Sequence, residues 1–309
     1  MGKQQAYVMG ASELYSEDIN PELKNLRDVL EYQFNQKINL LLESKRPRKS
    51  YSTKGKLCSR KLYQTPFNDN VFKKHLHVPS SDTTIVFLID ASGSMENVMG
   101  FETGGHRYEL DRLEACNAVV SAFANSINKV VDDQIKIEVF TKTSADIESH
   151  GLLGIKGSFP HLTRVYSNST KSKKATSDRI LKILARSPMC RKYPNGELRG
   201  IGSSTPEYAV LPALHDWIKK NITTKNVVVF NLTDGDTYCS LGYQSSNNSF
   251  TKMMREKYLR HIDNITLYID GEADEYARSI YGDNLIGTDG DFVSPMFNEL
   301  IKIFNKSVQ

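Results

Sequence analysis

The chain has 309 residues, of which 25% are charged and 39% are hydrophobic, and its formal net charge at pH 7 is +4. This composition is typical of an ordinary globular protein and excludes a disordered or fibrous chain. The length allows one large domain, or one domain with a substantial extension.

Cysteine spacing and apolar runs indicate the compartment. There is no C-x-x-C pair and no Cys/His cluster, which argues against a zinc ribbon and a disulfide framework. The cysteines are instead widely spaced, at Cys58, Cys116, Cys190 and Cys239. The sequence has no apolar run of signal-peptide length near its start and no stretch of about 18 apolar residues. We therefore expect a cytoplasmic protein outside the membrane.

A long helix is predicted near residues 21–42. Asn20 has the character of an N-cap, Pro21 suits the first helical position, and Glu22 is an acidic first-turn residue. Apolar residues then recur at steps of three and four, at Leu23, Leu26, Leu30, Phe34, Ile38 and Leu41. Such a stripe either packs on the main domain, which is the commoner arrangement, or docks a partner.

The segment 45–61 is strongly basic, with eight Lys and Arg residues in seventeen positions. Such a run could bind phosphates, although a solvated linker is the commoner meaning of a charge run. The nearby Tyr51 and Tyr63 do not form a stacking platform. Nucleic-acid binding through this segment is therefore kept as an alternative function.

From residue 83 onward, strand and helix patterns alternate. Strands are expected at 85–89, 135–140, 227–230 and 265–269, and helices at 113–130, 206–219, 251–260 and from 295. Alternation of this kind predicts an α/β fold with a doubly wound, mostly parallel sheet. We expect residues 83–309 to form this domain and residues 1–82 a helical and basic extension, with 145–200 as an insertion or long loop.

Two predicted strands end in acidic loops that also carry hydroxyl groups. The first ends in Asp90-Ala91-Ser92-Gly93-Ser94, and the strand at 227–231 is followed by Leu232-Thr233-Asp234-Gly235-Asp236. A hydroxyl-rich turn, Gly202-Ser203-Ser204-Thr205-Pro206, lies between them in the chain. Ligands of open α/β sheets bind beyond the carboxyl ends of the strands. Hard cations such as Mg²⁺ prefer oxygen ligands, so these loops predict a site for Mg²⁺ or another divalent cation such as Mn²⁺.

The stretches IVFLIDASGSM and VVVFNLTDGD, separated by the hydroxyl turn, resemble the metal-ion-dependent adhesion site of von Willebrand factor A (VWA) domains. The resemblance covers about 83–309. It implies that Asp90, Ser92 and Ser94 are first-loop ligands and that Asp234 is a carboxylate bridged to the metal by water. The second-loop hydroxyl is that of Thr205, which precedes a proline, or that of Ser204. The resemblance also implies that an acidic side chain of a partner protein completes the metal shell.

A narrower resemblance involves the segments GKLCSRKLYQTPFNDNVFKK and GSSTPEYAVLPAL, which are similar to the VWA region of the T subunit of aerobic cobaltochelatase. That resemblance implies a ring-forming AAA+ ATPase as partner in a chelatase-like complex. This chain lacks the long acidic region typical of the T subunit. A stand-alone relative that works with an AAA+ ATPase is therefore the alternative.

Motifs for catalysis are absent from the sequence. It has no G-x-x-x-x-G-K-[ST] phosphate loop, no G-x-S-x-G elbow and no cysteine with an evident base. We expect a non-catalytic subunit, without catalytic or cofactor-binding residues of its own. A hydrolase that uses the metal site is an alternative, because carboxylates beside a cation can support phosphoryl hydrolysis. A purely structural alternative is that Asp90 and Asp234 cap helices.

Overall fold

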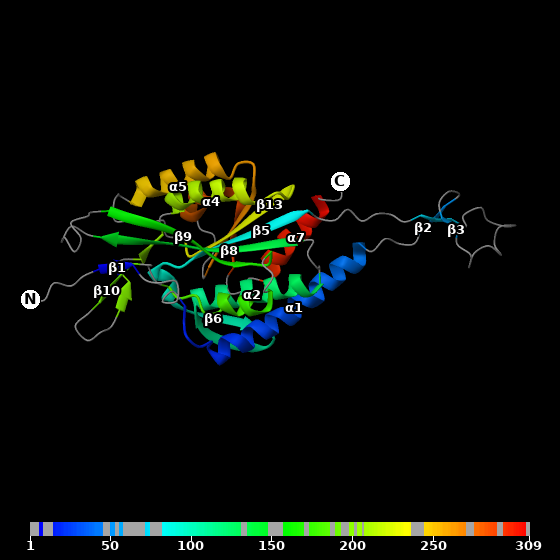
Figure 1. Cartoon of the computed structure of the whole chain (residues 1–309), viewed down its shortest axis with the longest axis horizontal. Helices are drawn as coiled ribbons and strands as arrows, with labels where there is room; N and C mark the ends of the chain where they lie inside the picture. The colour runs from blue at the N-terminus through cyan, green and yellow to red at the C-terminus, as the bar shows by residue number, and fades with distance from the viewer. Residues whose placement is uncertain are drawn as a thin grey trace, which may run out of the picture.

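A mostly parallel sheet lies between two layers of helices (Figure 1). The computed structural model describes residues 6–8, 15–45, 50–52, 56–57, 72–74, 82–130, 135–147, 157–169, 173–185, 189–192, 198–200, 203–205, 207–235, 244–269, 275–288 and 293–306. The strands of the sheet are β5 (Thr83–Asp90), β8 (Ile135–Ile147), β9 (Gly157–Ser167), β12 (Ser203–Ser204), β13 (Asn226–Thr233), β14 (Asp263–Tyr268) and β15 (Leu285–Gly287). The helices are α1 (Pro21–Lys45), α2 (Arg112–Val130), α3 (Lys173–Ile180), α4 (Glu207–Asn221), α5 (Gln244–Tyr258), α6 (Glu275–Tyr281) and α7 (Val293–Lys306).

The strand order is β12-β8-β5-β13-β14-β15, and β9 also pairs with β8. β5 is parallel to β8 and β13, and β14 is parallel to β13 and β15. Only β9 and β12 run antiparallel to their neighbour β8. Helices supply the crossovers that parallel strands require, for example α2 between β5 and β8. The predicted doubly wound, mostly parallel α/β fold is therefore confirmed.

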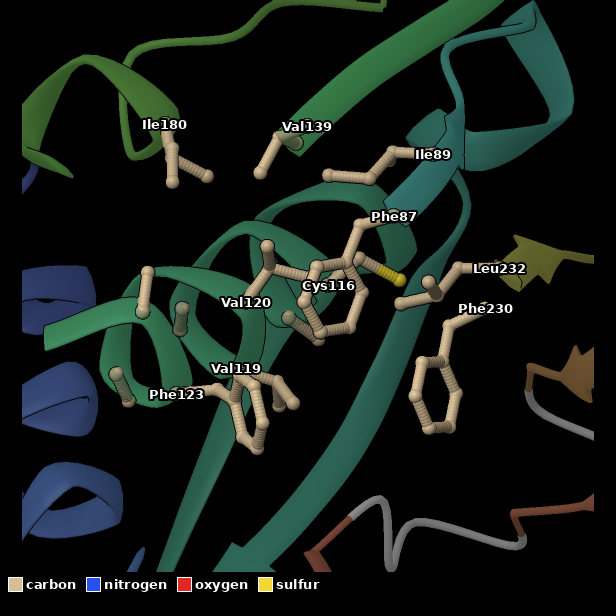
Figure 2. Packing of buried hydrophobic residues seen from close by; sticks show 14 of the residues in the cluster. Phe87, Ile89, Cys116, Val119, Val120, Phe123, Val139, Ile180, Phe230 and Leu232 are labelled. Carbon is tan, nitrogen blue, oxygen red and sulfur yellow. The ribbon is translucent and has the colours of Figure 1, made fainter. Parts of the chain in front are cut away.

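The core is built around β5, whose eight residues are all buried. Side chains of a strand alternate between its two faces. Phe87 and Ile89 face α2, where Phe87 packs edge-on against Phe123 and stacks on Phe230, each at a centroid distance of 5.4 Å (Figure 2). Val86 and Leu88 belong to the cluster on the opposite face, which includes residues of α4. Burial on both faces explains the uninterrupted apolar run of the strand.

The predicted N-terminal helix is α1, which packs into the same core cluster as β5 and α2. Its apolar stripe is buried from Leu23 to Ile38, and Phe34 meets Phe123 edge-on at 5.5 Å. Arg27 adds an ion pair with Asp178 at 2.5 Å. The stripe therefore packs on the main domain, while the side chain of Leu41 lies outside the described residues.

Several elements were not expected from the sequence. A hairpin of β6 (Val98–Thr103) and β7 (His106–Asp111) separates the first loop from α2. The expectation of an insertion or long loop over 145–200 was wrong in part, because this stretch holds the end of β8 together with β9, α3, β10 (Met189–Lys192) and β11 (Leu198–Gly200). Long antiparallel pairing with β8 stabilises β9. η4 (Gly282–Asn284) follows α6.

Small sheets complete the described part of the chain: β1 (Ala6–Val8) pairs with β10, and β4 (Phe72–Lys74) pairs with β2 (Ser50–Ser52) and β3 (Lys56–Leu57). The side chains of the basic segment 45–61 lie outside the described residues. No helix within the described ranges combines the length and apolar character needed to span a membrane.

Candidate metal centre

The first loop begins where β5 ends, at the fully buried Asp90. The backbone N–H of Ser92 donates to Asp90 Oδ1 at 3.0 Å, which turns the chain back over the end of the strand. The short helix η3 (Gly93–Glu96) follows, and the N–H of Met95 donates to the carbonyl of Ser92 at 3.1 Å. This turn brings the Oγ atoms of Ser92 and Ser94 to 3.1 Å from each other.

The second loop reaches the same place because of the length of β8. β5 pairs with β8 as far as Asp90 opposite Lys142, and Ser204 then pairs with Ser144 two residues farther along β8. Since β9 occupies the other edge of β8 there, β12 lies directly beyond the end of β5. Thr205 follows β12, and its buried hydroxyl donates to Asp90 Oδ1 at 3.2 Å. Of the two candidate hydroxyls, that of Thr205 contacts Asp90, whereas the side chain of Ser204 lies outside the described residues.

The third loop follows β13. The hydroxyl of Thr233 donates to Asp90 Oδ2 at 2.8 Å and accepts the N–H of Gly235 at 3.3 Å. Gly235 has φ +91°, and a Cβ atom there would lie 2.0 Å from the ring of Tyr268, so this turn requires glycine. Asp234 lies between Thr233 and Gly235 with its side chain 3% exposed. Its Oδ1 atom is buried and has no hydrogen-bond partner among the described residues.

These oxygens fit a small divalent cation. Mg²⁺ binds oxygen at about 2.0–2.1 Å in octahedral geometry, so adjacent ligand oxygens lie about 2.9 Å apart. The pairs Ser92–Ser94 and Asp90–Thr205 are 3.1 Å and 3.2 Å apart, and the orphaned Oδ1 of Asp234 adds a further acceptor. In the described part of the chain, no three His, Cys, Asp or Glu side chains converge as metal ligands. A cation here would therefore depend on hydroxyl oxygens as well as on two carboxylates.

The electrostatics of Asp90 also suit a cation. Burial is the largest cause that raises the pKa of Asp90, the charge of Asp234 raises it further, and Lys142 opposes the shift. A divalent cation at this position would favour the ionised carboxylate and lower that pKa. The raised pKa of Asp90 therefore shows that Lys142 does not fully offset its burial and the nearby charge of Asp234.

A buried ion-pair network, unforeseen from the sequence, lies beneath the site. Lys142 Nζ is 2.6 Å from Glu207 Oε2 and 3.7 Å from Asp90 Oδ2, and all three side chains are fully buried. Arg255 Nη1 is 2.6 Å from Glu207 Oε1, and the Asn231 amide donates to Glu207 Oε2 at 3.1 Å. Burial alone would raise the pKa of Glu207, but Lys142 and Arg255 outweigh it and lower this pKa to about 2.

Arg112, the first residue of α2, contacts the outer side of the site. Its Nη1 atom is 3.3 Å from Asp234 Oδ2 and 3.5 Å from the carbonyl oxygen of Ser94. Only weak sequence signals point to these charged residues. Lys142 interrupts a strand pattern opposite Asp90, and Glu207 follows Thr205 by two positions, but only the register of the sheet brings them together.

Comparisons with known proteins leave the function open. No family model and no curated protein matches this sequence. Among solved structures, the chain is similar to the pilus adhesin SpaC from Lactobacillus rhamnosus GG in its open conformation. That match has 15% identity and a TM-score of 0.44, and covers 73% of this chain and 30% of the adhesin. An uncharacterized membrane spanning protein from Vibrio fischeri matches with 14% identity and a TM-score of 0.27, over 71% of this chain and 97% of that one.

Proposed function

We propose that this chain is a protein-binding module that holds one Mg²⁺ or Mn²⁺ ion and accepts an acidic side chain of a partner protein at that ion. The ligands in this proposal are Asp90, Ser92, Ser94, Thr205 and Asp234. The observation that carries it is the convergence of three loops on Asp90, of which the second and third lie more than a hundred residues after the first. Helix capping alone does not require this convergence, because a capping side chain bonds to its own helix.

Each side chain of the site has a distinct role in this proposal. Asp90 supplies a charged oxygen, while the hydroxyls of Ser92, Ser94 and Thr205 supply neutral ones. The hydroxyl of Thr233 donates to Asp90 Oδ2 and so fixes the carboxylate plane. When bound, a divalent cation supplies an electrophilic coordination position at which a carboxylate can bind. Neutral hydroxyl ligands preserve that electrophilic character.

A charge count supports an acidic ligand from outside. The ion pairs at the site join three carboxylates, of Asp90, Asp234 and Glu207, with three cations, of Lys142, Arg112 and Arg255. These six paired charges sum to zero, so a divalent cation would add an excess of two positive charges to the set. A carboxylate from a partner would offset half of that excess, and charged groups away from water are stable only when they are compensated.

The partner in this proposal is an AAA+ ATPase, and the setting is a cytoplasmic, chelatase-like complex in which this chain is not itself catalytic. The motif resemblance to the T subunit of cobaltochelatase supports this choice. The proposed division of labour assigns nucleotide hydrolysis to the partner and metal-dependent docking to this chain.

Metal binding is tested first, by calorimetric titration of the full chain with Mn²⁺. The wild type should bind one ion, and Asp90→Asn should lose at least about 100-fold in affinity because the charged ligand is removed without loss of shape. Asp82→Asn, the same change at an exposed residue just before β5, is the control and should bind like the wild type. The proposal fails if the wild type binds no ion, or if Asp90→Asn binds as tightly.

The partner is tested by affinity capture from source lysate, in Mg²⁺ and in EDTA, with identification by mass spectrometry. An AAA+ ATPase should be retained by the wild type and by Asp82→Asn in Mg²⁺. It should be absent in EDTA and with Asp90→Asn. Equal capture under all four conditions would contradict metal-dependent docking.

A further inference from the structure

The backbone position of Arg112 is fixed by the start of α2. The N–H of Glu114 donates to Asp111 Oδ1 at 2.6 Å, and the N–H of Asp111 donates back to Glu114 Oε2 at 3.4 Å. This reciprocal pair is a capping box, which anchors the first turn of a helix. The N–H of Arg112 donates to the carbonyl of Asn97 at 3.1 Å. The helix therefore begins at a defined place beside the first loop.

From this position the guanidinium reaches two residues of the candidate metal centre. Its Nη1 atom lies 3.3 Å from Asp234 Oδ2 and 3.5 Å from the Ser94 carbonyl oxygen. The Arg112 side chain is 18% exposed. Its charge is therefore screened less than that of an arginine on the open surface, while one side of the group still reaches solvent.

We propose that Arg112 weakens divalent-cation binding when no acidic ligand is present and strengthens it when one is bound. The inference rests on the proposed function, and it assigns a positioning and specificity role to a residue outside the ligand set. Without a ligand, the guanidinium neutralises Asp234 and repels a second cation nearby. With a carboxylate ligand present, the same planar group can donate paired hydrogen bonds to it.

Arg112 therefore lowers the affinity of the site for the metal alone and raises its affinity for the metal together with the carboxylate. Such coupling is reciprocal, so a carboxylate must raise metal affinity by the same factor by which the metal raises carboxylate affinity. The consequence for the protein is that the metal and the acidic ligand bind more tightly together than either binds alone.

The test measures Mn²⁺ affinity of the full chain in sodium chloride and in sodium acetate of equal ionic strength. Acetate is the probe carboxylate, and free Mn²⁺ is corrected for acetate complexes with protein-free buffer. Arg112→Gln should bind Mn²⁺ alone roughly tenfold more tightly than the wild type, because one like charge near a dication costs about that much even with screening close to that of water. Acetate should tighten Mn²⁺ binding in the wild type and should do so less in this variant.

Two further variants separate charge from shape. Arg112→Lys keeps the charge but not the planar fork, so its affinity for Mn²⁺ alone should match the wild type while the acetate effect falls. Arg107→Gln removes a positive charge from an exposed position on β7 and should change neither quantity.

The outcomes distinguish this inference from the proposed function. A purely structural role for Arg112 predicts that Arg112→Gln loosens the site and weakens Mn²⁺ binding. Unchanged or weaker binding by this variant, with normal binding by the wild type, would overturn the inference alone. Absence of Mn²⁺ binding by the wild type would overturn the proposed function and this inference with it.

Discussion

Replacement of Glu207 by glutamine should be strongly destabilising, although it changes little in volume. Glu207 is fully buried and is the shared partner of Lys142 and Arg255, each at 2.6 Å. The variant leaves both cations buried without this counter-charge. Removal of one member of a buried ion pair costs about 3–5 kcal/mol.

The pKa of Glu207 gives a second estimate of the stability that Glu207→Gln should lose. Its value is lowered from 4.5 to about 2, which corresponds to about 3 kcal/mol of stability at neutral pH. Because the folded-state pKa is depressed, this stability is fully present above pH 4.5 and is lost as the pH falls toward 2. The stability difference between the wild type and Glu207→Gln should therefore be constant from pH 7 to about 5 and then shrink.

Urea unfolding at pH 7, 5, 4 and 3 measures this difference. Trp217 is the single tryptophan and packs on Phe140 at 4.8 Å, so its fluorescence reports the fold directly. The melting temperature at pH 7 should fall by about 6 °C or more. Glu256→Gln, the same change at an exposed position on α5, is the control and should stay within about 0.5 kcal/mol of the wild type. A loss below about 1 kcal/mol at pH 7 for Glu207→Gln, or a difference that is undiminished at pH 3, would refute the reasoning.

Three other predictions concern single sites. Thr205→Val should weaken Mn²⁺ binding in calorimetry by about 10- to 100-fold, because it removes the hydroxyl that contacts Asp90 without change of shape. An equal loss of affinity in Ser204→Ala would contradict the choice of Thr205 as the second-loop ligand. Gly235→Ala should lower thermal stability by about 2–3 kcal/mol or more, since its Cβ would overlap Tyr268 at positive φ; an unchanged melting temperature would count against this strained turn. Phe34→Ala should cost about 3–5 kcal/mol in urea unfolding, and a cost below about 1 kcal/mol would show that α1 is not part of the cooperative core.

The sequence predicts the central fold well because its strands are buried on both faces. The apolar run at 85–89 and its counterpart at 227–230 correspond to β5 and β13, with boundaries only a few residues longer. The same reasoning misses the β6–β7 hairpin and β9. Their strands bury only part of their side chains, so their apolar pattern is weak and long-range pairing decides the structure.

The candidate ligands could be predicted, whereas their charged surroundings could not. Asp90, Ser92 and Ser94 follow one another at alternate positions of one loop, a pattern visible in the sequence. Arg112 and Lys142 reach the site only through the start of α2 and the register of β8. Ion pairs of this kind depend on elements that are distant in the chain, and local sequence patterns carry little information about them.

The length of β8 connects the geometry of the site with its electrostatics. The strand runs beyond the end of β5, so its last residues are available to pair with β12, and this pairing places Thr205 over Asp90. The last β8 residue opposite β5 is Lys142, which lies directly across from Asp90. The same strand thus brings the second-loop hydroxyl to the carboxylate and supplies the cation beneath it. Lys142, Arg112 and Arg255 already balance the charge of the paired carboxylates, so a bound divalent cation would add positive charge that the proposed acidic partner offsets in part.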